Sequence, residues 1–164
     1  MEKKNLSLEI IDHYLEQELL MASLYERFSK YYTTHKEFWA SLVSEEHEHA
    51  AWIKHLQDGV TQGKIYFSEG KIRITAIDSI ITYVKTRINE FDQQPFDLKI
   101  AASICLDIEK SLIERNVFKR FESDSADVKT ILDVLSEVQE KHIDKIKQFK
   151  DLLEKARESV LLNS

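Results

Sequence analysis

The chain has few of the residues that interrupt helices. Its 164 residues include three glycines and one proline, while 43% of them are hydrophobic and 32% are charged. Such a composition supplies enough apolar side chains for a core and leaves little sequence for loops. It predicts an all-α fold, with a single domain that spans residues 1–164.

Other absences exclude whole classes of function. The single cysteine, Cys105, excludes an intramolecular disulfide and a Cys-x-x-Cys metal cluster, and it favours a reducing compartment. No apolar run approaches the roughly 20 residues that a helix needs to cross a bilayer. The formal net charge is −6, and lysines alternate with glutamates without forming a basic stripe. We therefore expect a cytoplasmic protein that binds neither membranes nor nucleic acid.

Apolar residues recur at helical spacing in five segments. The first predicted helix covers residues 6–31, and the second runs from a capping box at Thr34 and Glu37 to Gly59 and Gly63. The third begins at caps at Thr75 and Asp78 and ends before Pro95. The fourth runs from Pro95 to Phe121, and the fifth begins after Ser125. Residues 64–74 read as irregular or as a brief hairpin around Gly70. Two helical hairpins joined by about 35 residues predict a four-helix bundle whose long crossover contains a short fifth helix.

Charged and polar residues interrupt the apolar stripes near the middle of the long helices. Glu46 and His49 lie within the stripe of Trp39, Leu42, Ile53, Leu56 and Val60, while Glu18, Glu109, Gln139 and His142 interrupt the other three stripes. A lone glutamate in such a stripe usually reaches out to solvent. Several charged or polar residues at the same level of neighbouring helices favour a shared interior site, because ionised side chains are rarely buried unless they are paired or bound to a metal.

The spacing of Glu46 and His49 suits a metal ion. Residues three apart lie on one face of a helix, so the carboxylate can bridge two ions while the imidazole binds one of them. Single glutamates on the partner helices complete the shell, and this chain lacks the thiolates that structural zinc usually recruits. The predicted metal ligands are Glu18, Glu46, His49, Glu109, Gln139 and His142.

These residues resemble the ligand pattern of the rubrerythrin-type di-iron domain of the ferritin-like superfamily. The match covers nearly the whole chain and implies a ferritin-like fold and peroxide-detoxifying or ferroxidase activity. Three positions depart from that pattern: Gln139 replaces the second bridging glutamate, Leu112 replaces a further glutamate, and Asn116 replaces a tyrosine. The rubredoxin-like iron module of full rubrerythrins is also missing, so electrons would come from an external donor.

The substitution at position 139 weakens one metal position. Glu18, Glu46 and Glu109 supply a charge of −3 against +4 for two divalent ions. We expect iron as two ions, the second held less tightly, with manganese or zinc as alternatives.

Several other polar residues have a plainer explanation. Tyr25, one heptad from Glu18, is either a hydrogen-bond donor to a ligand carboxylate or an ordinary core tyrosine. Cys105 is expected to behave as a small buried hydrophobe. The residues expected on solvated faces are His13, His35, Glu45, His47, Glu48 and His55.

Two hypotheses of function follow from these patterns. The first is a non-haem di-iron oxidoreductase, in which two ferrous ions reduce dioxygen or peroxide. The second is a non-catalytic helical bundle with a degenerate or single-metal site, used for iron binding or protein interaction. Gln139 and Leu112 favour the second hypothesis, and a homodimer is expected in preference to a cage.

Overall fold

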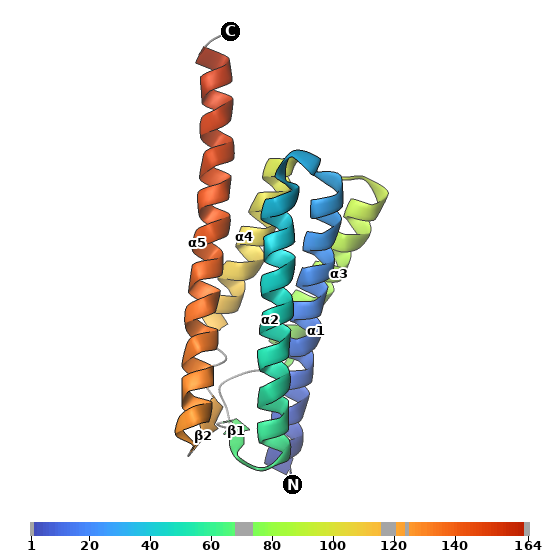
Figure 1. The fold of residues 1–164 in the computed structure, drawn as a ribbon. Helices are drawn as coiled ribbons and strands as arrows, with labels where there is room; N and C mark the ends of the chain where they lie inside the picture. Colours follow the sequence, from blue (N-terminus) through green and yellow to red (C-terminus); the bar gives the residue numbers. More distant parts are fainter. Residues whose placement is uncertain (1, 68–73, 116–120, 124, 163–164) are drawn as a thin grey trace.

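The computed structural model describes residues 2–67, 74–115, 121–123 and 125–162 and is all-α in class, as predicted. The α-helices of this part are α1 (Glu2–Tyr31), α2 (Lys36–Thr61), α3 (Ile74–Gln93), α4 (Leu98–Arg115) and α5 (Ala126–Leu162) (Figure 1). A 3₁₀ turn, Thr33–His35, joins α1 to α2. Two strands, β1 (Ile65–Phe67) and β2 (Phe121–Ser123), complete the described elements.

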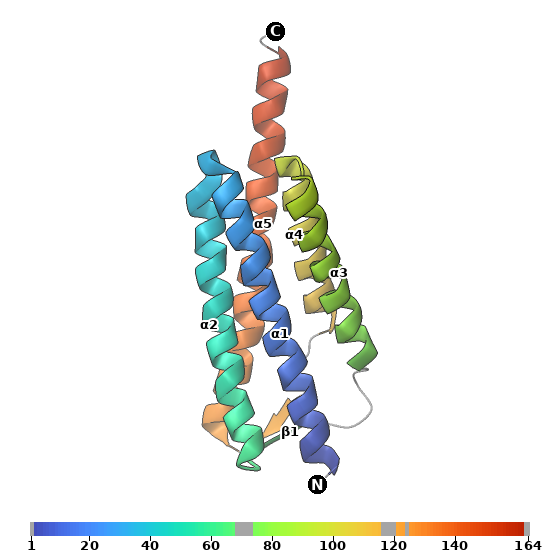
Figure 2. The same cartoon turned by 90° about the vertical axis from the view of Figure 1, so that its right-hand side faces the viewer.

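The helices lie side by side and alternate in direction along the chain (Figures 1 and 2). Helix α1 packs against α2 and α3, and α5 packs against α4 and α2. Because α3 runs from the end where α2 stops to the end where α4 starts, it returns the chain along the length of the molecule. Helix α5 extends past the ends of the other helices (Figure 1).

The start of α2 differs from the prediction. The helix begins at Lys36, and no side chain caps either the 3₁₀ turn or α2, so the capping box predicted at Thr34 and Glu37 is wrong. Backbone hydrogen bonds close the turn instead, since the Tyr32 N–H donates to the Phe28 carbonyl at 2.8 Å and the His35 N–H donates to the Tyr32 carbonyl at 2.9 Å. The Lys36 N–H also donates to the Thr33 carbonyl, so backbone hydrogen bonds alone lead the chain from α1 into α2.

Two further predictions are wrong. Helix α3, which was predicted to be a short helix within a crossover, has 20 residues. Phe121 lies in β2 and not at the end of a helix. Strand β1 pairs antiparallel with β2, with Ile65 opposite Ser123, so a segment distant in sequence supplies its partner. The predicted turn at Gly70 lies outside the described residues.

The core consists of two apolar clusters. One lies around Phe28, Trp39 and Phe149, and the other around Ile10, Ile53 and Leu135. Along α1, α2 and α5, the polar residues singled out in the sequence fall between the members of these two clusters. None of the described helices combines the length and the apolarity needed to cross a membrane.

Candidate metal centre

Four helices bring the predicted charged ligands together in the interior. Helix α1 contributes Glu18, α2 contributes Glu46 and His49, α4 contributes Glu109, and α5 contributes His142. None of these five residues is more than 5% exposed. The alternative prediction, that such glutamates reach out to solvent, is therefore wrong for all three of them. The helices bury these residues because each lies in line with the apolar stripe of its own helix.

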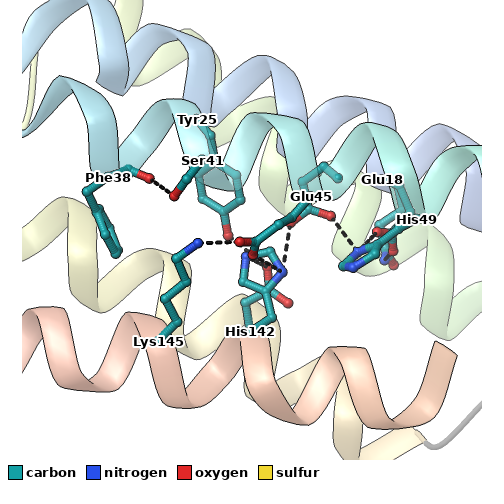
Figure 3. A network of polar contacts seen from close by, with 11 residues as sticks. Glu18, Tyr25, Phe38, Ser41, Glu45, His49, His142 and Lys145 are labelled. Atoms are coloured by element: carbon teal, nitrogen blue, oxygen red, sulfur yellow. Dashed lines mark hydrogen bonds and ion pairs between the residues drawn. The ribbon is translucent and has the colours of Figure 1, made fainter. Parts of the chain in front are cut away.

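One half of the centre surrounds His49. Its Nδ1 lies 3.1 Å from Oε2 of Glu18 and 3.2 Å from Oε2 of Glu46 (Figure 3). Glu46 and His49 are three residues apart on α2, so one helix face presents both groups to α1. A nitrogen and two carboxylate oxygens thus converge from two neighbouring helices.

The other half surrounds His142. Its Nδ1 lies 3.4 Å from Oε1 of Glu46, and its Nε2 lies 3.9 Å from Oε1 of Glu109. The ring centroids of His49 and His142 are 5.6 Å apart. The Glu46 carboxylate therefore directs one oxygen to each imidazole. A carboxylate that bridges two cations takes this position.

Several polar atoms of the centre have no hydrogen-bond partner within the described part of the chain. They are Oε1 of Glu46, Nε2 of His49 and both ring nitrogens of His142. Buried polar atoms nearly always have a partner, and an unpaired one destabilises the fold. One donor atom each from Glu46, His49 and His142 lie within 4.8 Å of one another. The residues present therefore fit a cation, which would satisfy these atoms.

Burial and mutual charge separate the pKa values of the carboxyl groups. Burial, followed by the charges of Glu18 and Glu109, raises the pKa of Glu46 well above its ordinary value. Burial also raises the pKa of Glu109. Burial acts in the same sense on Glu18, but hydrogen bonds with His49 and Glu46 together outweigh it and lower the pKa of Glu18. Burial opposes the charged form of His49, yet the bond to Glu18 leaves the His49 pKa raised.

Tyr25 links the centre to the aromatic cluster. Its hydroxyl donates to Oε1 of Glu109 at 2.7 Å, which confirms the predicted hydrogen bond to one of the glutamates. Burial and then the charge of Glu109 raise the pKa of Tyr25 well above its ordinary value. The free thiol of Cys105 is buried nearby, and burial followed by Glu109 raises the pKa of Cys105 as well. The thiol is therefore protonated, as a small buried hydrophobe would be.

Sequence reasoning missed two polar residues beside the centre. Gln17 is buried, and its Nε2 donates to Oε1 of Glu18 at 3.4 Å. A signal for it exists, because Ile10, Tyr14, Gln17, Met21, Leu24 and Phe28 form a second buried stripe on α1. The other is Glu45, which was expected on a solvated face but lies 3.9 Å from His142. No periodicity in the sequence could have found Glu45.

Other predicted positions divide into two groups. The side chains of Gln139 and Leu112 and the whole of Asn116 lie outside the described residues, so ligation by Gln139 stays a prediction. The histidines expected away from the core, at positions 13, 35, 47 and 55, are half-buried or exposed, as predicted.

Comparison of the chain with protein-family models, with curated proteins and with solved structures gave no match.

Proposed function

We propose that this chain is a metal-binding protein of ferritin-like architecture, in which α1, α2, α4 and α5 form a four-helix bundle and α3 is the crossover helix. More specifically, we propose that the chain is a non-haem di-iron oxidoreductase that acts on dioxygen or peroxide. One observation carries the proposal: the buried Glu46 carboxylate lies between His49 and His142 with an oxygen directed at each.

The donor set favours iron over other metals. Carboxylate oxygens and imidazole nitrogens suit iron, with manganese and zinc as alternatives. Glu18 and His49 would hold one ion, His142 would hold the other through Nδ1, and Glu46 would bridge them, while Glu109 would add negative charge from the Nε2 side of the His142 ring. Bound iron would supply the electrons for reducing dioxygen or peroxide, and an external donor would restore them.

The chain itself would position the ligands and exclude water. The Tyr25 hydroxyl holds a proton at Oε1 of Glu109, which orients that carboxylate. The Nε2 amide of Gln17 orients Glu18 in the same manner. Apolar clusters on both sides of the centre keep bulk water away, which strengthens every electrostatic interaction inside it.

The decisive test is anaerobic titration with Fe²⁺ followed by peroxide. The wild-type chain should bind iron and then develop ferric absorption in the near ultraviolet. Glu46→Gln should abolish that absorption, because it removes the only carboxylate that faces both imidazoles among the described residues. His47→Ala, an exposed change on the same helix, is the control and should behave as wild type. A wild-type chain that stays colourless and binds no metal would contradict the proposal.

A second candidate is a non-catalytic bundle that holds one ion. It is favoured by Glu46, His49 and His142, which form one group of donor atoms within 4.8 Å of one another in the described part of the chain. Gln139 and Leu112, in place of glutamates, agree with it. This candidate predicts one metal per chain and no reaction with peroxide. If missing charge at position 139 excludes the second ion, Gln139→Glu should raise the stoichiometry from one to two, and no rise would point to another defect.

A further inference from the structure

Glu45 reaches the centre from the flank of α2. Successive helix residues are rotated by about 100°, so the residue before Glu46 is expected to point away from the core. The Glu45 carboxylate turns towards α5 instead (Figure 3). Its Oε1 forms an ion pair with Nζ of Lys145, and its Oε2 lies 3.9 Å from Nδ1 of His142. The Glu45 side chain is 32% exposed, so it contacts solvent and also lies beside the buried imidazole of His142.

The two halves of the centre then have the same plan. The Nδ1 of His49 faces one oxygen of Glu18 and one oxygen of Glu46. The Nδ1 of His142 faces the other oxygen of Glu46 and one oxygen of Glu45. Glu46 therefore belongs to both halves, and Glu45 faces the Nδ1 of His142 as Glu18 faces the Nδ1 of His49.

The distances around His142 suit a single cation. Bonds from a metal to oxygen or nitrogen are about 2.0–2.2 Å long, so two donors on one ion lie at most about 4.4 Å apart. The separations from Nδ1 of His142, 3.4 Å to Glu46 and 3.9 Å to Glu45, are within that limit. In addition, Nδ1 of His142 and Oε1 of Glu46 are buried and lack a hydrogen-bond partner in the described part of the chain. The unpartnered atoms point to a ligand between them.

We propose that Glu45 is a ligand of the second metal ion, in the position that Glu18 has for the first. The inference rests on the proposed metal centre and identifies what completes it. Glu45 adds a fourth carboxylate to the centre, in place of the one that the neutral Gln139 lacks, although its charge is shared with Lys145. Lys145 holds the other oxygen of Glu45 and so orients the carboxylate. Since Glu45 is partly exposed, the second ion exchanges with solvent more readily than the first.

The experiment is a calorimetric titration of the purified chain with Co²⁺ alone, together with visible absorption of the bound Co²⁺. The wild-type chain should bind two ions. Glu45→Gln should keep the first ion and bind the second more than about 100-fold more weakly, because loss of a merely supporting partner costs roughly 10- to 100-fold. The absorption of the second Co²⁺ should change as its ligand set changes. Circular dichroism verifies that the variant is folded.

Two matched variants separate ligation from other roles of Glu45. Glu48→Gln removes the same charge from an exposed position of α2 and should still bind two ions. Lys145→Gln breaks the ion pair but keeps the carboxylate, so it should also bind two. If Lys145→Gln weakens the second ion as much as Glu45→Gln does, Glu45 acts only through the ion pair and the inference is wrong.

The remaining outcomes distinguish this inference from the function on which it depends. If the wild-type chain binds two ions and Glu45→Gln binds both with unchanged affinity, Glu45 is not a ligand, although the metal centre stands. If the wild-type chain binds one ion and Glu45→Gln is identical to it, the inference is overturned in the same way. A wild-type chain that binds no Co²⁺ overturns the metal centre and this inference together.

Discussion

The aromatic end of the core and its polar middle are stabilised in different ways. At the aromatic end, Trp39 packs edge-on against Phe28, with ring centroids 4.9 Å apart, and against Phe149, at 5.5 Å. Apart from the indole N–H of Trp39, which has no hydrogen-bond partner among the described residues, these contacts are apolar and favourable without any ligand. In the middle, carboxylates and imidazoles are buried with several atoms that have no hydrogen-bond partner in the described part of the chain, which is unfavourable unless a ligand or a proton compensates them.

The difference separates stability from function along the same helices. Burial of aromatic and aliphatic side chains at both ends stabilises the fold enough to tolerate an unfavourable middle. Functional sites are commonly maintained in this way, at the expense of stability that an apolar core would give. Substitutions in the two regions should therefore change the free energy of unfolding in opposite directions.

The largest effect is expected at the aromatic end. Trp39→Ala should lower the free energy of unfolding by about 3–5 kcal/mol, because it leaves a cavity where a fully buried ring contacts several neighbours. Urea denaturation followed by circular dichroism measures the change. Trp52→Ala, on the exposed face of α2, is the control and should stay within about 0.5 kcal/mol of wild type. Equal losses of unfolding free energy at both positions would show that burial in the aromatic cluster adds no stability beyond that of an exposed tryptophan.

In the polar middle, stability without metal should fall as the pH rises. The raised pKa values of Glu46 and Glu109 stabilise the fold fully below pH 4.5, and that contribution is lost as the pH rises through the raised values. The raised pKa of His49 acts in the same direction above pH 6.5. Only Glu18, whose pKa is lowered, opposes this trend, and its contribution is lost below pH 4.5.

Glu46→Gln should therefore make the metal-free protein more stable than the wild-type chain at pH 8, since it removes a buried carboxyl group with a raised pKa at nearly constant volume. Its melting temperature should depend less on pH than that of the wild-type chain. Thermal melts in the presence of a chelator at pH 5.5 and pH 8 give both quantities. Glu37→Gln, an exposed change in the first turn of α2, is the matched control. A wild-type melting temperature equal at the two pH values would contradict the burial argument.

Helical periodicity made most of the centre predictable. Glu18, Glu46 and His142 lie in line with apolar stripes, and burial of a stripe buries every residue in it. The start of α2 and the position of Phe121 were predicted less well, because backbone hydrogen bonds form the 3₁₀ turn before α2 and Phe121 pairs with Phe67 in a strand. Glu45 was expected only on a solvated face, and its approach to His142 could not be predicted, since Lys145, 100 residues further along, pairs with its carboxylate.

The smallest effect is expected where the two regions meet, at Tyr25. Tyr25→Phe keeps the ring but removes the hydrogen bond to Glu109, which should lower the free energy of unfolding by about 1 kcal/mol. That hydrogen bond favours the ionised carboxylate, so its loss should raise the pKa of Glu109 further and weaken binding of a divalent ion. Urea denaturation and Co²⁺ titration measure the two effects, with Tyr83→Phe at an exposed position of α3 as the control. Unchanged Co²⁺ affinity in Tyr25→Phe would show that the aromatic end and the polar middle are energetically independent at this hydrogen bond.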